Sequence, residues 1–171
     1  PDTQVYREVY GAGVCDVATA AIIGKKATDH NMKVLIDFHY SDFWADPKKQ
    51  RVPKQWEGMS LEEKTSALSE FTEESLNTLL DAGVDVGMVQ VGNEINNGMA
   101  GETDEANVYQ LLKAGSAAVA AIGTAGFFSW FGNSLVLIKS DKCKYDIKSL
   151  KDLLKYDITM AIGQIDTVPA G

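Results

Sequence analysis

Two short apolar runs, each next to a segment with helical periodicity, constrain the fold of this 171-residue chain most strongly. The runs are Lys33–Phe38 and Val84–Val91, and both are short enough for buried strands. Parallel sheets that are covered on both faces contain strands of this kind. Helical patterns before, between and after the runs give the order helix, strand, helix, strand, helix. This order predicts an α/β fold with a parallel sheet.

Capping residues predict where the helices begin. A Ser followed three residues later by Glu forms a capping box, and Asp or Thr is favoured at the residue before a first turn. The predicted starts are Asp16, Ser60 with Glu63, and Thr103 or Asp104. Glutamates 62, 63, 70, 73 and 74 share the second helix and are interpreted as its solvated face.

Bulk properties narrow the classes of partner. The formal net charge of -8 argues against nucleic acid and anionic membrane surfaces, which select basic patches. No apolar run approaches the roughly 20 residues that a membrane helix needs. No phosphate-binding or metal-ligand motif occurs, so we expect no cofactor and no metal. The two cysteines, Cys15 and Cys143, do not make a disulfide framework.

A glutamate ends the second predicted strand, in Gln90-Val-Gly-Asn-Glu94. Barrel enzymes place catalytic groups at the carboxyl ends of strands. Glycoside hydrolysis needs one carboxyl to protonate the leaving oxygen and a second as nucleophile or base. The amide of Asn93 suits a hydrogen bond to a sugar 2-hydroxyl. A second interpretation also stands, in which Asn93 and Glu94 only cap the next turn.

The loop after the first predicted strand, residues 41–59, is long and rich in aromatic and charged residues. Long loops in compact domains are usually functional or disordered. Here His39 and Asp42 are candidates for orienting substrate or the catalytic carboxyl. Aromatic rings can stack on sugar C–H faces, and the candidates for this are Tyr40, Phe43, Trp44 and Trp56. The alternatives are aromatic packing on the domain surface and a satisfied core histidine.

With these residues in hand, the chain from about Tyr10 to Val119 resembles glycoside hydrolase family 53, the endo-β-1,4-galactanases that cut arabinogalactan. The resemblance rests on several long motifs. They are Tyr10-Gly-Ala-Gly13, Val34-Leu-Ile-Asp-Phe-His-Tyr-Ser-Asp-Phe-Trp-Ala-Asp-Pro47, Trp56-Glu-Gly-Met59, Val89-Gln-Val-Gly-Asn-Glu94 and Gly98-Met-Ala-Gly-Glu-Thr-Asp104.

The resemblance implies a partial (β/α)₈ TIM barrel, with strands 3 and 4 and their flanking helices. It implies a retaining mechanism in which Glu94 is the acid/base and Asn93 lies on the sugar 2-hydroxyl. His39 and Trp44 resemble site-lining residues, and Asp42 joins them as a predicted substrate ligand. The family's nucleophile is a second glutamate on the seventh strand, and no residue here matches it. We therefore expect the substrate to be arabinogalactan and the isolated chain to be inactive.

The tail resembles a different family, the periplasmic molybdate-binding proteins of ABC importers. The matching segments are Gly132–Ile138, Ile147–Leu153, Ala161–Gly163 and Val168–Gly171. The resemblance implies a fragment of a periplasmic-binding-protein-like α/β domain, with Ala170 in an oxyanion-binding turn and molybdate or tungstate as an alternative ligand. An unrelated α/β tail is the other interpretation. The pattern of the tail predicts a strand at residues 134–139, a helix at 147–154 and a strand at 158–162.

These resemblances predict a partial barrel over residues 1–122, a junction over 123–130 and a second segment over 131–171. Charge supports the division, because residues 1–121 carry 10 Lys and Arg against 19 Asp and Glu, whereas residues 122–171 carry 6 against 5. A misjoined gene model and a natural fusion both fit this pattern. Half a barrel is expected to leave open strand edges. Location is expected to be extracellular or periplasmic, with the signal peptide outside this chain.

Overall fold

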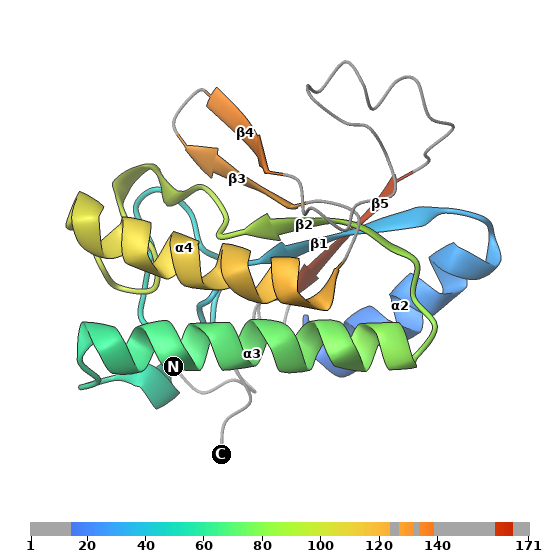
Figure 1. The fold of residues 1–171 in the computed structure, drawn as a ribbon, viewed down its shortest axis with the longest axis horizontal. Coiled ribbons are helices and arrows are strands. Elements are labelled where there is room, and N and C mark those ends of the chain that lie inside the picture. The colour runs from blue at the N-terminus through green and yellow to red at the C-terminus, as the bar shows by residue number, and fades with distance from the viewer. Residues whose placement is uncertain (1–14, 124–126, 132–133, 139–159, 166–171) are drawn as a thin grey trace, which may run out of the picture.

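The computed structural model describes residues 15–123, 127–131, 134–138 and 160–165. In this part of the chain, three α-helices accompany one five-stranded sheet (Figure 1). The α-helices and strands are α2 (Val17–Asp29), β1 (Lys33–Phe38), α3 (Leu61–Asp81), β2 (Val86–Val91), α4 (Glu105–Ile122), β3 (Phe127–Phe131), β4 (Ser134–Ile138) and β5 (Met160–Ile165). Two short 3₁₀ helices, η1 (Lys54–Trp56) and η2 (Ile95–Asn97), lie in the loops.

The helix starts predicted from capping residues are confirmed. Asp16 caps α2 by accepting the Thr19 N–H at 2.8 Å. Both halves of the capping box between Ser60 and Glu63 are formed at the start of α3. Asp104, rather than Thr103, caps α4. Each cap satisfies backbone N–H groups that the first turn of a helix leaves without an internal partner.

The two predicted strands are confirmed as parallel neighbours in the centre of the sheet, whose order is β4-β3-β2-β1-β5. Their register places Asp37 opposite Gln90 and Phe38 opposite Val91. Half a barrel is expected to leave open sheet edges, and the described sheet is open in this way, although β1 and β2 lie inside it. β3 pairs in parallel with β2 at Val89 and Gln90, and β5 pairs in parallel with all of β1, so each central strand has a neighbour on both sides. The sheet edges are β4, which is antiparallel to β3, and β5.

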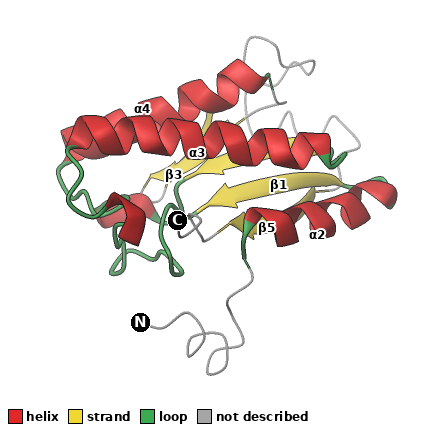
Figure 2. Cartoon of the chain, turned by 90° about the horizontal axis from the view of Figure 1, so that it is seen from below, coloured by secondary structure: helices red, strands yellow, loops and turns green. Residues whose placement is uncertain are grey.

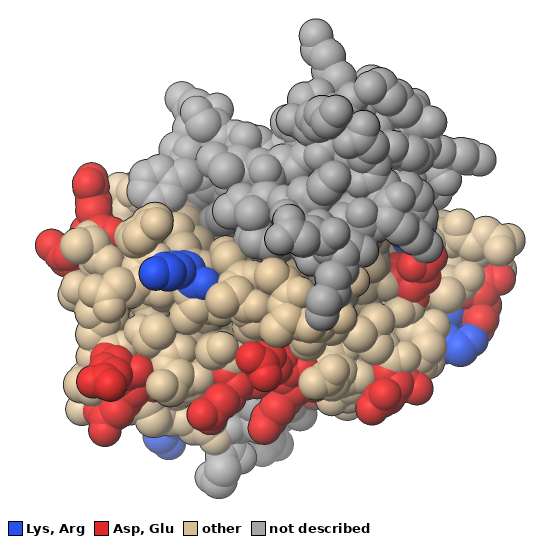
Figure 3. Space-filling model, viewed as in Figure 1, with Lys and Arg blue, Asp and Glu red and all other residues tan. Residues whose placement is uncertain are grey.

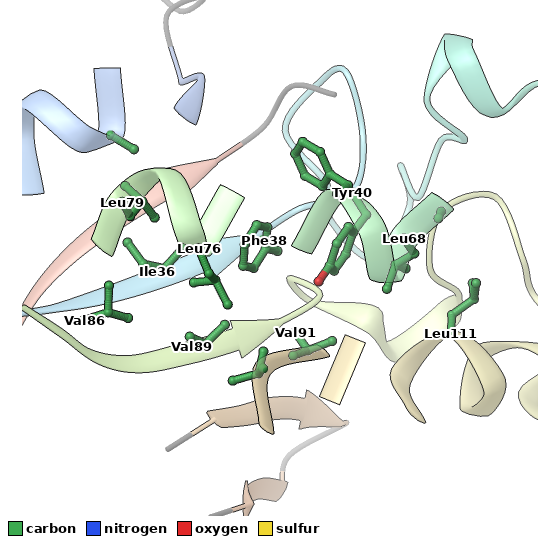
Figure 4. Packing of buried hydrophobic residues seen from close by; sticks show 14 of the residues in the cluster. Ile36, Phe38, Tyr40, Leu68, Leu76, Leu79, Val86, Val89, Val91 and Leu111 are labelled. Carbon is green, nitrogen blue, oxygen red and sulfur yellow. The ribbon is translucent and has the colours of Figure 1, made fainter. Parts of the chain in front are cut away.

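The helices form a layer on one side of the sheet, with α3 between α2 and α4 (Figures 1 and 2). The core lies between this layer and the sheet (Figure 4). Alternate residues of β1, Val34, Ile36 and Phe38, belong to the core because successive side chains of a strand point to opposite faces. The intervening residues Leu35 and Asp37 point to the other face and are also buried. Both faces of β1 are therefore covered, as its apolar sequence predicts.

The solvated face predicted for α3 is confirmed. Glutamates 62, 63, 70, 73 and 74 are all exposed, and acidic residues line the lower rim of the molecule over α3 in Figure 3. None of the described helices is long and apolar enough to cross a membrane.

The predictions for the tail have mixed outcomes. The strand expected at residues 134–139 is present as β4, and the strand expected at 158–162 is present as β5, shifted to Met160–Ile165. The helix expected at residues 147–154 lies outside the described residues. Strand β3 was not predicted, because the glycines around residues 123–132 suggested a junction. Its sequence, Phe127-Phe-Ser-Trp-Phe131, is aromatic and suits a strand.

Candidate active site

The carboxyl ends of β1 and β2 meet at one edge of the sheet because the strands are parallel and in register. Two loops leave this edge: the β1–α3 loop, residues 39–60, and the β2–α4 loop, residues 92–104. Between them lies an open pocket of about 290 Å³. The pocket is lined by Pro47, Gln90, Asn93, Glu94 and Asn96.

Glu94 lies near the start of the β2–α4 loop, exposed and in the lining of the pocket. Its backbone is left-handed, with φ 46° and ψ 45°. For a residue with a side chain this conformation costs roughly 1–2 kcal/mol, which the surrounding contacts must offset. Glu94 occupies the N-cap position of η2, yet its side chain makes no capping hydrogen bond. The carboxylate is therefore not used as a cap of η2, and Glu94 lines the pocket.

Asn93 connects the two loops with its side chain. Its Nδ2 donates to the Ala45 carbonyl at 2.9 Å, and its Oδ1 accepts from Gln90 Nε2 at 3.1 Å. One N–H of the amide and one lone pair of Oδ1 are left over after these bonds. Asn93 is therefore held in a fixed orientation while it keeps hydrogen-bonding capacity toward the pocket.

His39 is buried, with 1% of its surface exposed. Its Nδ1 accepts the Ala45 N–H at 2.9 Å, so the proton of the neutral ring lies on Nε2. Nε2 is 3.4 Å from Oδ2 of Asp37. The side chain thus behaves as the satisfied core histidine of the second interpretation. His39 fixes the backbone of Ala45, whose carbonyl accepts the hydrogen bond from Asn93. It therefore acts on the pocket through Ala45 and Asn93.

Trp44 is 55% exposed and makes an edge-to-face contact with His39, at 5.4 Å between ring centroids. An exposed indole beside the site suits a sugar face. The same prediction is wrong for Tyr40 and Trp56, which are 1% and 3% exposed and stack in the core. Burial of a large aromatic ring gains more free energy than exposure at a loop surface. Phe43 is half-buried, with the guanidinium of Arg51 over its ring at 5.8 Å.

Three predicted site residues among those that the structure describes, His39, Asp42 and Trp44, do not line the pocket. The carboxylate of Asp42 accepts the Lys54 N–H at 2.7 Å, a bond within the β1–α3 loop at the start of η1. Asp42 therefore shapes the loop that carries Trp44. Ala170, predicted for oxyanion binding, lies outside the described residues.

Sequence analysis did not name as site residues Gln90, which lines the pocket, or Asp37 and Gln50, which lie next to lining residues. Asp37 shares its face of the sheet with Gln90 and His39, and its Oδ1 is buried without a hydrogen-bond partner. A signal for it was present, because a carboxylate inside an apolar strand is costly unless it has a role. Gln50 Nε2 donates to the Asn93 carbonyl at 2.8 Å. Nothing in the local sequence distinguishes Gln50 from other polar loop residues.

Two ionisable groups close to the site have shifted pKa values. Burial raises the pKa of the Tyr40 hydroxyl well above its usual value, although the hydrogen bond with Thr72 opposes the shift. The pKa of Glu102 is lowered, chiefly by its hydrogen bond from Lys64 and then by that from Asn107. These bonds tie the β2–α4 loop to α3 and to α4. Among the described residues, no group of three or more His, Cys, Asp or Glu is placed to hold a metal ion.

Comparisons with known proteins agree with this geometry. The family model described as "Glycosyl hydrolase family 53" matches residues 1–144. The endo-β-1,4-galactanase of Bacillus subtilis is 47% identical over 151 residues, which cover 81% of this chain and 34% of the relative. The arabinogalactan endo-β-1,4-galactanase of Cellvibrio japonicus is 44% identical over 73 residues, covering 42% of this chain and 19% of the relative. The chain thus spans about a third, or less, of the length of these relatives.

A solved structure shows the same partial fold. The catalytic domain titled "Ignisphaera aggregans GH53 catalytic domain" superposes with a TM-score of 0.64 and 36% identity, covering 70% of this chain and 34% of that chain. A fungal β-1,4-galactanase structure gives a TM-score of 0.57 at 34% identity, over 60% of this chain and 32% of that one. The first part of the chain is therefore a partial (β/α)₈ barrel.

The comparisons give no support to the molybdate-binding resemblance of the tail. The family match runs to residue 144, beyond the boundary expected near residue 122. The division into segments at residues 122 and 131 stays a prediction. The family match covers most of the chain, and the parallel strands place Asn93 and Glu94 directly after β2. The chain therefore belongs to glycosyl hydrolase family 53.

Proposed function

We propose that this chain carries the acid/base half of a retaining endo-β-1,4-galactanase site, with Glu94 as the acid/base. The observation that carries the proposal is the exposed Glu94 carboxylate at the carboxyl end of β2, in a pocket that it shares with Asn93. Family membership and the names of the relatives support β-1,4-galactan, the backbone of arabinogalactan, as substrate.

In this proposal, Glu94 protonates the glycosidic oxygen as the bond to the leaving sugar breaks. It then removes a proton from the water that releases the second product. Asn93 donates to the 2-hydroxyl of the sugar being cleaved, an interaction that strengthens in the transition state. Trp44 offers its exposed face to a neighbouring sugar. Asp42 and His39 contribute by fixing the loop that carries Trp44 and Ala45.

The second carboxylate of the mechanism is expected from a part of the barrel that this chain does not match. For that reason the 171 residues alone are expected not to hydrolyse galactan. A polysaccharide substrate too large to cross a membrane supports an extracellular location. The alternatives that depend on the tail, a periplasmic location and oxyanion binding, have no supporting observation in the described residues.

The test places residues 1–144 of this chain in the Bacillus subtilis galactanase, in place of the segment they match. We expect this chimera to hydrolyse galactan and the Glu94→Gln chimera to lose about 10³-fold or more in kcat. Glu70→Gln, at an exposed position on α3, is the matched control and should leave kcat unchanged.

A second substrate separates acid catalysis from general damage. In an aryl β-1,4-galactobioside with an acidic phenol, the phenolate can leave without being protonated. Glu94→Gln should therefore slow formation of the glycosyl-enzyme from this substrate far less than it slows hydrolysis of galactan. Equal losses on both substrates would argue against Glu94 as the acid. Hydrolysis by the isolated chain that Glu94→Gln abolishes would instead show that the second carboxyl lies within these 171 residues.

A further inference from the structure

Gln50 lies where the β1–α3 loop crosses the β2–α4 loop. Its side-chain Nε2 donates to the Asn93 carbonyl at 2.8 Å and lies 3.3 Å from the carbonyl oxygens of Glu94 and Asp46. Its own backbone carbonyl accepts the Gly101 N–H at 2.8 Å. Gln50 therefore contacts the β2–α4 loop both near its start and near its end.

The position of these contacts decides what they control. The Asn93 carbonyl belongs to the peptide plane before Glu94, and the Glu94 carbonyl belongs to the plane after it. Rotation of the first plane changes φ of Glu94, and rotation of the second changes ψ. The Gln50 amide therefore holds both of the angles that make Glu94 left-handed, φ 46° and ψ 45°.

Other bonds between the loops act at different places. Asn93 Nδ2 donates to the Ala45 carbonyl, and Asn97 Nδ2 donates to the Pro47 carbonyl, each at 2.9 Å. These bonds place the loops side by side, but they do not involve the carbonyl groups of Asn93 and Glu94, which belong to the two peptide planes around Glu94. Gln50 Oε1, by contrast, is buried without a hydrogen-bond partner. Buried polar atoms without a partner are rare, and the bonds that Gln50 Nε2 makes to the β2–α4 loop give a reason for this one.

We propose that Gln50 is a positioning residue for Glu94, which keeps the left-handed backbone of Glu94 and so fixes the direction of its carboxylate. This inference rests on the proposed function only for what the carboxylate does. The backbone geometry and its dependence on Gln50 can be tested without any hydrolysis.

The first experiment measures amide hydrogen exchange in the full 171-residue chain and in Gln50→Met. Methionine matches the length of glutamine but donates no hydrogen bond. The reporters are the N–H groups of Gly98 and Met99, which bond to the carbonyls of Ile95 and Glu102 inside the β2–α4 loop. We expect their protection to fall about tenfold in Gln50→Met, because the loop opens more often. The amides of α3 should keep their protection.

Gln55→Met is the matched control. Gln55 is an exposed glutamine in the same β1–α3 loop, and its replacement should not change the exchange of Gly98 or Met99. An equal loss of protection in the two variants, or no loss in Gln50→Met, would overturn the proposal.

Gln50→Glu supplies a second test with a signature that simple loss of packing lacks. A carboxylate cannot donate to the Asn93 carbonyl, whereas a protonated carboxyl can. Protection of Gly98 and Met99 in this variant should be low at about pH 7.5 and should return toward that of the wild type at about pH 4.5. Gln50→Met should show no such return. If both variants fail to fold at either pH while Gln55→Met folds, Gln50 serves the fold as a whole, and the proposal is overturned.

Measurements of kcat and KM in the galactanase chimera test the effect of Gln50 on catalysis. Gln50→Met should lower kcat by about ten- to a hundredfold and leave KM within about twofold, because misplacement of a catalytic group by about 1 Å costs on this order. A raised KM with unchanged kcat would assign Gln50 to substrate binding and overturn positioning. An inactive parent chimera would count against the proposed function, while the exchange measurements would still decide the role of Gln50.

Discussion

The two edges of the β1–β2 pair are built in different ways. At the amino-terminal edge, short turns enter the strands, and Lys33 bonds to Asp85 while the Asp85 N–H bonds to the Thr28 hydroxyl. At the carboxyl-terminal edge, long loops carry a partly buried network of side chains that bond to backbone carbonyls of the other loop. Among the described non-glycine residues, three of the four with positive φ (Tyr40, Glu94 and Ala100) lie at this second edge, and the fourth, Asn31, lies at the amino-terminal edge.

This difference shows where the fold holds strain and polar groups. In barrel proteins the amino-terminal edge serves stability, and the carboxyl-terminal edge carries the chemistry. Left-handed backbone and buried polar atoms cost free energy, so they persist only where the surroundings fix them. Substitutions at the carboxyl-terminal edge should therefore change both stability and the geometry of Glu94. Substitutions at the other edge should leave the geometry of Glu94 unchanged, and loss of its ion pair should change stability only slightly.

The largest effect is expected for His39→Ala. It removes a buried ring and leaves the Ala45 N–H without its acceptor, so the free energy of unfolding should fall by about 3 kcal/mol. Urea unfolding of the full chain measures this loss. Asn at position 39 places an oxygen near the Nδ1 position, so His39→Asn should recover about 1 kcal/mol. Equal losses in the two variants would show that the bond to Ala45 contributes nothing.

Asn93→Ala should cost about 1.5 kcal/mol of unfolding free energy, because it removes the bonds to the Ala45 carbonyl and from Gln90. In the galactanase chimera it should also lower kcat about a hundredfold. Asn93→Asp keeps the acceptor for Gln90 and loses the donor to Ala45, so its stability should lie between those of Ala and Asn. A variant with normal kcat would remove Asn93 from the proposed site.

Tyr40→Phe should cost about 1 kcal/mol at neutral pH, through loss of the bond with Thr72. It should also change the alkaline pH dependence of stability. The buried hydroxyl has a raised pKa, so its contribution is fully present below the usual tyrosine pKa of 10.0 and is lost as pH rises above it toward the higher folded value. The wild type should therefore lose stability above about pH 10 faster than Tyr40→Phe. Parallel curves in this range would contradict the assigned burial effect.

The smallest effect is expected at the amino-terminal edge. Lys33→Met breaks the ion pair with Asp85, whose Nζ–Oδ2 distance is 2.7 Å and whose carboxylate is half exposed. Pairs of this kind contribute under about 0.5–1 kcal/mol, and the kinetics of the chimera should not change. A loss comparable to that of His39→Ala would remove the proposed contrast between the edges.

Sequence alone determined the secondary structure of the first part of the chain, and it predicted a site at the carboxyl ends of the two strands. Asp16, Ser60 with Glu63, and Asp104 mark helix starts because their side chains satisfy backbone groups a few residues away. The apolar run of β1 predicts burial on both faces, and Asn93 with Glu94 marks the end of a strand. Each of these signals depends on residues that are close together in the sequence, so it can be recognised from the sequence alone.

Tertiary structure alone decided which loop residues serve the core and which reach the pocket. Tyr40 and Trp56 are aromatic like Trp44, yet only packing against α3 and β1 places them in the core. Gln50 acts on Asn93 and Glu94 across a long sequence separation, and strands 160–165 and 127–131 pair with β1 and β2. Hydrogen bonds between distant segments, and the burial of side chains among them, depend on which segments the fold brings together. The local sequence pattern carries no information about such long-range contacts.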